Sequence, residues 1–319
     1  MVIGLVAENV AGDSVTLLSP DAVKEVIDRT GLEFLVESGV GRVSGFDDED
    51  YARAGGRVVR KEEAYRAEVI VRRSAPSKEE LALMDDGSLV VSMLHPDGCP
   101  EKVRNYEDAG VGGIALDMLL DDRGRRSVYL ADITAQNGLD YGYSLLGSDP
   151  ADVSVVIMGY GNLGKEAVEH ASRKRSDVRV LNKRHFQDIS SHIGDVDMLV
   201  NAINWPFHLR GKERIMTRED LRYMKPGSVL VDLVVNPPGM SPIETSTPTY
   251  QDNLHYTTDG IVHACCWGWP GLTPERTCLA YSKIMPGIIT DFVNGGLEGR
   301  PANTTRAYVN TAAFRGVGR

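Results

Sequence analysis

The chain has 319 residues, of which 42% are hydrophobic and 25% are charged, and its net charge is −10. This composition is typical of a globular protein, and the length predicts two domains. The acidic balance and the absence of a long basic run argue against binding to a phosphate backbone, so we expect no nucleic-acid partner. Without an 18-residue apolar run or a visible signal peptide, the sequence predicts a cytoplasmic protein with no membrane contact.

The N-terminal part of the chain alternates short β-branched runs with helical stretches. The expected strands are residues 2–6, 34–37, 69–72, 89–94 and 113–116, and the expected helices are residues 20–30, 49–55, 77–84 and 100–109. Ser19 and Pro20 are typical of the start of the first helix, and Asp47 and Asp48 favour the start of the second. Strands that alternate with helices indicate a parallel sheet with helices on both faces.

A second alternating series follows a connecting segment. Its expected strands are residues 153–158, 178–181, 198–203 and 229–235. The connecting segment, residues 134–146, is expected to be a helix capped by Thr134 or Asp132. Residues 273–295 predict a long helix that is kinked at Pro286.

A glycine pattern follows the first strand of the second series. Gly159 allows a tight turn, Gly161 lets the backbone approach a pyrophosphate, and Gly164 allows close packing of the next helix. That helix begins near Asn162 and Leu163, and its free N–H groups can bind phosphate. Because the pattern lies between a strand and a helix, it predicts a dinucleotide site more strongly than a purely structural turn.

The end of the next strand discriminates between the two nicotinamide cofactors. A site for NAD normally has an acidic residue there, which binds the ribose 2′-hydroxyl. Here the residues are Asn182, Lys183 and Arg184, which favour the 2′-phosphate of NADP, although NAD remains possible. The alternative is a solvated basic turn. Thr134, at the expected start of the connecting helix, either contacts a cofactor phosphate or only caps that helix.

The four cysteines do not indicate a disulfide framework. Cys99, Cys265, Cys266 and Cys278 form no CxxC pair, and closely spaced zinc ligands are lacking. We therefore expect buried cysteines that behave as small hydrophobic residues, and no metal site.

Motifs along almost the whole chain resemble the alanine dehydrogenase/transhydrogenase α-subunit family. The matching segments are residues 35–41, 44–51, 54–55, 224–232, 244–249 and 259–263. The resemblance implies an α/β fold with two Rossmann-like doubly wound parallel-sheet domains and an active-site cleft between them. It implies a substrate domain built from residues 1–133 and 274–319, and an NAD(P)-binding domain built from residues 134–273. We also expect a homo-oligomer.

Several substrate-site residues of that family are replaced in this chain. The family's catalytic histidine is retained as His95, which a proline follows. The arginine that holds the substrate carboxylate matches Ser14-Val15, the catalytic aspartate matches Asn236, and a loop asparagine matches Gly268. The family's lysine near the third strand has no lysine counterpart, and the nearby cations are Arg72 and Arg73.

The length and the His95-Pro96 pair most resemble the N5-(carboxyethyl)ornithine synthases, which are NADP-dependent. This resemblance implies an oxidoreductase that reduces an imine, or a 2-oxo acid and amine pair, to an amino acid or an N-carboxyalkyl amino acid. We expect His95 to transfer protons, Arg72 or Arg73 to clamp a carboxylate, and Asn236 to orient the substrate or nicotinamide. The alternatives are an amino acid dehydrogenase that releases ammonia and a non-catalytic dinucleotide-binding protein; the retained His95 favours an enzyme.

Overall fold

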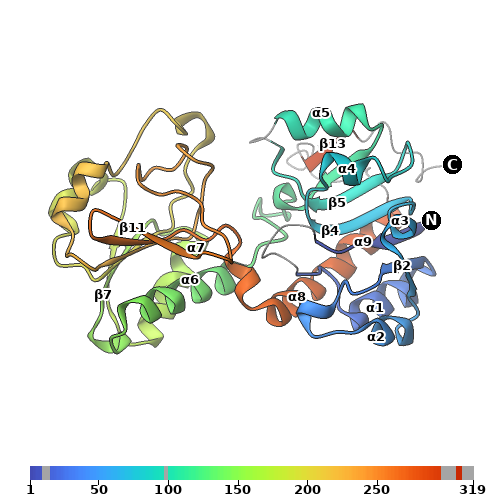
Figure 1. Ribbon diagram of the computed structural model, residues 1–319, viewed down its shortest axis with the longest axis horizontal. Coiled ribbons are helices and arrows are strands. Elements are labelled where there is room, and N and C mark those ends of the chain that lie inside the picture. Colours follow the sequence, from blue (N-terminus) through green and yellow to red (C-terminus); the bar gives the residue numbers. More distant parts are fainter. Residues whose placement is uncertain (9–14, 97–99, 296–306, 311–319) are drawn as a thin grey trace. The chain divides into compact units, whose positions relative to one another are not determined.

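The computed structural model describes residues 1–8, 15–96, 100–295 and 307–310 (Figure 1). The chain divides into two compact units, of which one comprises residues 1–129 and 274–319 and the other residues 130–273. Each unit contains its own sheet of mostly parallel strands together with several helices. The predicted α/β class with two Rossmann-like parallel sheets is therefore confirmed. None of the helices in the described ranges is long and apolar enough to cross a membrane.

The sheet of the first unit has seven strands in the order β13-β6-β5-β4-β1-β2-β3. Neighbouring strands are parallel except for β13, which pairs antiparallel with β6. The interior strands are nearly continuous runs of buried apolar residues, as is expected for a sheet covered on both faces. Their bounds are β1 (Val2–Leu5), β2 (Glu33–Glu37), β3 (Arg57–Val59), β4 (Val69–Ser74), β5 (Leu89–Met93), β6 (Gly112–Ala115) and β13 (Tyr308–Val309).

The first two helices of this unit begin at the capping residues that the sequence indicates, whereas α3 was not predicted. The Ser19 hydroxyl accepts a hydrogen bond from the Ala22 N–H, and Pro20 is the first helical residue of α1. Asp47 caps α2 in a reciprocal capping box with Asp50. The helices up to residue 108 are α1 (Pro20–Thr30), α2 (Asp48–Arg53), α3 (Lys61–Ala64), α4 (Lys78–Leu81) and α5 (Pro100–Asp108).

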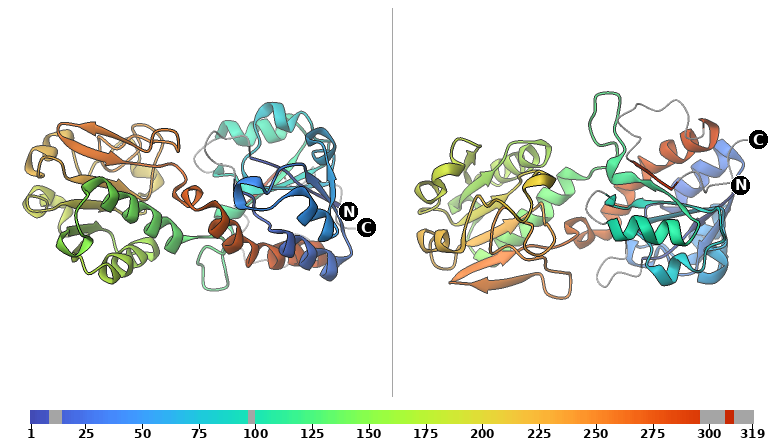
Figure 2. Two further views of the ribbon diagram at one scale, coloured as in Figure 1. Left: turned by 60° about the horizontal axis from the view of Figure 1, so that its bottom comes forward. Right: turned by 90° about the horizontal axis from the view of Figure 1, so that it is seen from above.

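The C-terminal helical segment differs from the prediction. It forms two helices, α8 (Pro274–Ser282) and α9 (Met285–Gly295), instead of one kinked helix. Pro286 lies in the first turn of α9, where its missing N–H costs no hydrogen bond, so it starts a helix. Helix α9 lies beside α1 (Figure 2).

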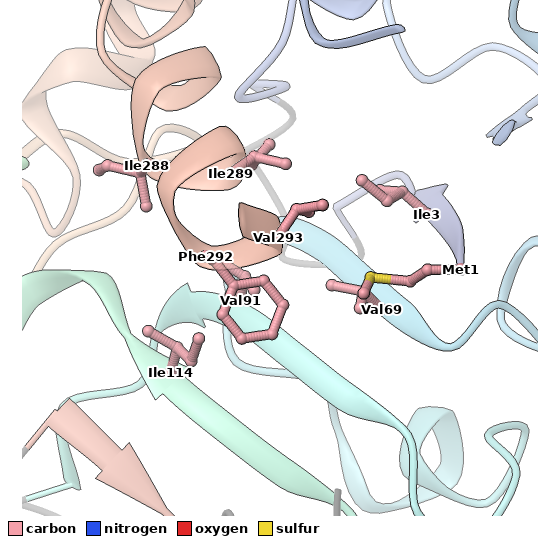
Figure 3. Close-up of a pocket in the computed structure, with 9 residues that line it drawn as sticks. All are labelled: Met1, Ile3, Val69, Val91, Ile114, Ile288, Ile289, Phe292 and Val293. Carbon is pink, nitrogen blue, oxygen red and sulfur yellow. The ribbon is translucent and has the colours of Figure 1, made fainter. Parts of the chain in front are cut away.

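A small gap remains between α9 and the sheet of the first unit. Figure 3 shows that only apolar side chains line it: Met1, Ile3, Val69, Val91, Ile114, Ile288, Ile289, Phe292 and Val293. With no polar group to orient a ligand, this gap is a feature of core packing.

The sheet of the second unit has six strands in the order β11-β12-β10-β9-β7-β8, and only β11 is antiparallel to its neighbour. The antiparallel hairpin of β11 and β12 was not predicted, because β11 is exposed or half-buried along its length and forms no apolar run. The elements of this unit are α6 (Ala131–Leu146), β7 (Ser154–Met158), α7 (Asn162–Arg173), β8 (Asp177–Leu181), β9 (Met198–Asn201), β10 (Val229–Asp232), β11 (His255–Thr258) and β12 (Ile261–Ala264).

The start of α6 corrects the prediction for the connecting helix. It begins at Ala131, three residues earlier than expected, and no side chain caps it. Thr134 lies inside the helix, and its hydroxyl donates to the Leu130 carbonyl oxygen at 2.8 Å. Neither Thr134 nor Asp132, which is itself a helical residue, is the cap.

The cysteines that the structure describes are buried, as predicted, and none of them forms a disulfide: Cys265, Cys266 and Cys278. Cys99 lies outside the described residues.

Candidate functional site

The first sheet has a topological switch point between β1 and β4. From β1 the chain proceeds through β2 and β3 on one side, and it then returns to β4 on the other side. In open α/β sheets, ligands bind beyond the carboxyl ends of the strands at such a point. The polar side chains at this edge come from four neighbouring strand ends: Glu8 after β1, Arg72 and Arg73 in β4, His95 after β5 and Asp117 after β6.

His95 and Asp117 form a hydrogen-bonded pair at this edge. The His95 Nδ1 lies 3.1 Å from one Asp117 carboxylate oxygen, and the His95 backbone N–H donates to the other oxygen at 3.2 Å. The Asp117 side chain is 5% exposed, whereas the His95 side chain is 52% exposed. His95 also has a φ of +50°, which is uncommon for a residue with a side chain. The backbone and the carboxylate thus hold the imidazole with its Nε2 edge available to a ligand.

The negative charge of Asp117 suits a residue that holds the His95 ring. Burial opposes ionisation of Asp117, but the hydrogen bonds from His95 and the positive charges of His95 and Arg126 outweigh it and lower the pKa of the carboxyl group. An ionised Asp117 fixes the proton of the neutral imidazole on Nδ1 and stabilises the imidazolium when Nε2 takes a second proton. The pair can therefore carry out acid–base chemistry near neutral pH.

Asp117 was not identified in the sequence. It lies in the short 3-10 helix Leu116–Met118 directly after β6, and β6 is the neighbour of β5. One signal in the sequence could have identified Asp117. It is an acidic residue just beyond a buried strand, and that strand lies next to the strand that ends before His95. Recognising this signal requires knowing that β5 and β6 are adjacent.

Arg72 is fully buried and already paired. Its Nη1 donates to the Tyr65 hydroxyl at 2.5 Å and to Glu80 at 2.7 Å, and its Nη2 lies 3.3 Å from Glu8. Burial opposes the charge of Arg72, but Glu8, Glu80 and Tyr65 outweigh it and raise the pKa of the guanidinium. Arg73 is 9% exposed, and it hydrogen-bonds to Tyr281 of α8. The structure therefore places both arginines inside the unit, which differs from the expectation of a cation that faces a ligand.

The second sheet has its own switch point, between β7 and β9, and the glycine pattern lies there. Gly159 has a φ of +97°, and a Cβ added to it would lie 3.0 Å from the Ala202 carbonyl oxygen. A Cβ added to Gly164 would lie 2.2 Å from the Gly159 carbonyl oxygen, whereas one added to Gly161 has no neighbour within 4 Å. The first and third glycines thus allow close packing, and the second leaves the loop open to a ligand.

The N-terminus of α7 provides the donors at this loop. The first hydrogen bond between backbone groups four residues apart runs from the Lys165 N–H to the Gly161 carbonyl oxygen. The helix therefore offers no acceptor to the N–H groups of Asn162, Leu163 and Gly164. These groups and the positive end of the helix dipole suit a pyrophosphate.

The turn after β8 exposes the predicted basic residues. Lys183 and Arg184 are exposed, and the Arg184 N–H donates to the Asn182 side-chain oxygen at 3.0 Å. The Asn182 N–H donates to the His185 Nδ1 at 3.0 Å. Asn182 thus shapes the turn through its own hydrogen bonds, and the two cations extend from it.

Asn236 lies beyond the end of β10, where it is 2% exposed. Its side-chain N–H donates to the Val234 carbonyl oxygen at 2.7 Å. The structure therefore shows Asn236 stabilising its own loop. Across the described ranges, no group of three or more His, Cys, Asp or Glu residues could hold a metal ion.

Comparison with known proteins gives matches over most of the chain. Residues 4–135 match the N-terminal domain of the alanine dehydrogenase/PNT family, and residues 182–313 match its C-terminal domain. An alanine dehydrogenase of Bacillus subtilis is 27% identical over 98% of this chain and 91% of the relative. Alanine dehydrogenase 1 of Staphylococcus aureus is 22% identical over 93% of this chain and 89% of the relative.

Two solved structures share the fold. An L-alanine dehydrogenase superimposes with a TM-score of 0.82 and 23% identity, covering 93% of this chain and 91% of that one. The transhydrogenase from Sinorhizobium meliloti superimposes with a TM-score of 0.81 and 22% identity, covering 92% of this chain and 94% of that one.

Proposed function

The chain belongs to the alanine dehydrogenase/PNT family, and we propose that it is an NADPH-dependent oxidoreductase that reduces the imine of a 2-oxo acid and an amine. The product is an N-carboxyalkyl amino acid when the amine belongs to another amino acid, and an ordinary amino acid when it is ammonia. At the coarser level, the chain is a pyridine-nucleotide oxidoreductase of the alanine dehydrogenase type. The observation that carries the proposal is the hydrogen-bonded pair of His95 and Asp117 at the carboxyl edge of the first sheet, beyond β5 and β6.

The proton chemistry follows from this pair. A reduced nicotinamide, when bound, supplies the hydride that adds to the imine carbon. His95, in its imidazolium form, donates the Nε2 proton to the imine nitrogen, which makes the carbon more electrophilic and leaves a neutral imidazole. Asp117 keeps the ring in the correct orientation and stabilises the imidazolium before transfer. In the opposite direction, the neutral imidazole accepts the proton.

The preference for NADPH rests on the turn after β8. No carboxylate follows the strand, and two exposed cations lie where the 2′-phosphate of NADP is bound in this fold. Because the Arg184 N–H is held by Asn182, the backbone of the turn is fixed before a cofactor binds. The same turn repels no part of NAD, so we expect the chain to prefer NADPH without excluding NADH.

The substitutions in the substrate region support a substrate other than alanine. Val15, one of the two residues that match the family's carboxylate-binding arginine, is 1% exposed and belongs to the core, and Ser14 lies outside the described residues. Asn236, at the position of the catalytic aspartate, is buried and cannot exchange a proton at neutral pH. The second candidate function is an amino acid dehydrogenase that releases ammonia, which is favoured by the coverage of the Bacillus subtilis relative over nearly its whole length.

NADPH oxidation against a panel of 2-oxo acids and amines, ammonia included, tests the proposal. We expect NADPH oxidation only when a 2-oxo acid and a primary amine are both present. Mass spectrometry should then detect a secondary amine as the product. Activity in which ammonia is the only amine accepted establishes the second candidate function. If the chain binds NADPH but no pair in the panel causes its oxidation, both candidate functions are contradicted.

A further inference from the structure

We propose that Arg126 binds the α-carboxylate of the substrate next to His95. This inference rests on the proposed function, because it assumes that His95 is the proton donor. It concerns a residue that the sequence did not single out and that lies in the hairpin after β6. The ligand class is a 2-oxo, 2-imino or 2-amino acid, in which the carboxylate and the reacting nitrogen are attached to the same carbon.

Other cations near this edge are engaged elsewhere. Arg72 is 1% exposed and is neutralised by Glu8 and Glu80, and Arg73 is buried and hydrogen-bonded to Tyr281. Using either of them as a clamp requires breaking a buried contact, which is costly. Val15 offers no charge. A carboxylate that reaches His95 therefore needs a cation from another element.

Arg126 is connected to His95 through one residue. Its Nε donates to the backbone carbonyl oxygen of Asp117 at 2.8 Å, while the Asp117 carboxylate holds the backbone and Nδ1 of His95. The Arg126 guanidinium also lies over the ring of Tyr129, with its central carbon 5.1 Å from the ring centroid. Asp117 thus positions the proton donor with its side chain and the cation with its main chain.

These contacts leave the binding end of Arg126 open. The hydrogen bond uses Nε, and the ring covers one face, so the fork of Nη1 and Nη2 remains for a bidentate carboxylate. Arg126 is exposed, and within the described part of the chain no residue forms a salt bridge with it. Its positive charge acts to lower the pKa values of Asp117 and Tyr281, so the Arg126 side chain belongs to the groups at this edge.

The hairpin holds Arg126 in place. Arg126 pairs with Leu120 in an antiparallel bridge, and the Ser127 N–H donates to the Leu119 carbonyl oxygen at 2.8 Å. The Asp121 carboxylate accepts hydrogen bonds from the N–H groups of Arg123 and Arg125, which closes the turn. A fixed backbone reduces the entropy lost when the guanidinium binds a ligand.

Arg125 provides a matched control. It is the adjacent residue, it is also exposed, and its guanidinium is paired with Asp121 at 2.8 Å. Replacing it removes the same charge from the same hairpin without touching Asp117. Comparing variants of the two arginines therefore separates a general loss of positive charge from the loss of the carboxylate-binding residue.

The test compares Arg126→Gln, Arg126→Lys and Arg125→Gln with the unmodified chain, using the active pair from the substrate panel. For Arg126→Gln we expect the KM for the 2-oxo acid to rise roughly ten- to a hundredfold, with a much smaller fall in kcat and an unchanged KM for NADPH. Lysine should restore part of the loss, and Arg125→Gln should leave all three constants unchanged. The unmodified chain should also prefer the 2-oxo acid over its neutral 2-oxo amide, and Arg126→Gln should lose that preference.

An unchanged KM in Arg126→Gln, an equal effect in Arg125→Gln, or a retained preference for the carboxylate over the amide overturns the inference while the proposed function stands. An unmodified chain that turns over no pair in the panel overturns the proposed function, and the inference fails with it.

Discussion

The carboxyl edges of the two sheets use different kinds of chemistry. At the second sheet, three glycines and the start of α7 present backbone N–H groups, and the loop is open at Gly161. At the first sheet, side chains dominate: Arg72 is buried between carboxylates, and Asp117 holds His95. The proposed cofactor edge therefore depends on local backbone geometry, whereas the proposed substrate edge depends on contacts between strands that are distant in sequence.

The largest effect is expected at the cofactor edge. Gly161→Val should abolish dinucleotide binding in a folded chain, because a Cβ meets no atom within 4 Å there and the branched side chain fills the space of the pyrophosphate. Fluorescence titration with NADPH and a thermal melt measure the two properties. Gly164→Ala is the contrasting variant, since its Cβ would clash with the Gly159 carbonyl oxygen, and it should lower the melting temperature. Normal NADPH binding by Gly161→Val would show that the glycine pattern only forms a turn and does not bind the cofactor.

At the substrate edge, His95→Gln should lower kcat by roughly 10²–10⁴-fold while NADPH affinity stays the same. Glutamine can still accept a hydrogen bond but cannot transfer a proton at neutral pH. His208→Gln, which alters an exposed histidine in the second unit, is the control and should leave kcat unchanged. Near-normal turnover in His95→Gln would move the acid–base role to another residue.

Arg184→Ala should weaken NADPH binding by roughly ten- to a hundredfold and leave NADH binding nearly unchanged. Alanine keeps the N–H that donates to Asn182, so the turn survives and only the contact to the 2′-phosphate is lost. The matched control is Arg179→Ala, which removes a β8 arginine that is paired with Asp195. Tighter binding of NADH than of NADPH by the unmodified chain would reverse the assignment.

The smallest effect concerns stability in acid. The pKa of Asp117 is lowered in the folded chain, so its contribution to stability is complete well above its unfolded pKa of about 3.9 and is lost as the pH falls toward the folded value. Urea unfolding between about pH 6 and pH 2 should therefore show a smaller acid-induced loss of stability in Asp117→Asn than in the unmodified chain. Parallel curves for the two proteins would mean that Asp117 has the same pKa folded and unfolded.

This difference between the two edges also explains what could be predicted from the sequence. The longer apolar strands of both sheets, the capped start of α1 and the glycine loop follow from local patterns and were predicted, whereas the short strands β3, β11, β12 and β13 were not. The pairing of His95 with Asp117 joins residues that are 22 positions apart, so it depends on the adjacency of β5 and β6. Arg72 shows the same limit, because its partner Glu8 lies 64 positions away and the pairing occurs only when β1 and β4 are neighbours.

The central claim is that Asp117 positions His95 for proton transfer. The kcat for imine reduction in the unmodified chain, Asp117→Asn, His95→Gln and the double variant tests it most directly. Because Asp117 acts only through His95, Asp117→Asn should lower kcat without changing NADPH affinity, and it should cause no further loss once His95 is replaced. An unchanged kcat in Asp117→Asn, or an additive loss in the double variant, would contradict the account.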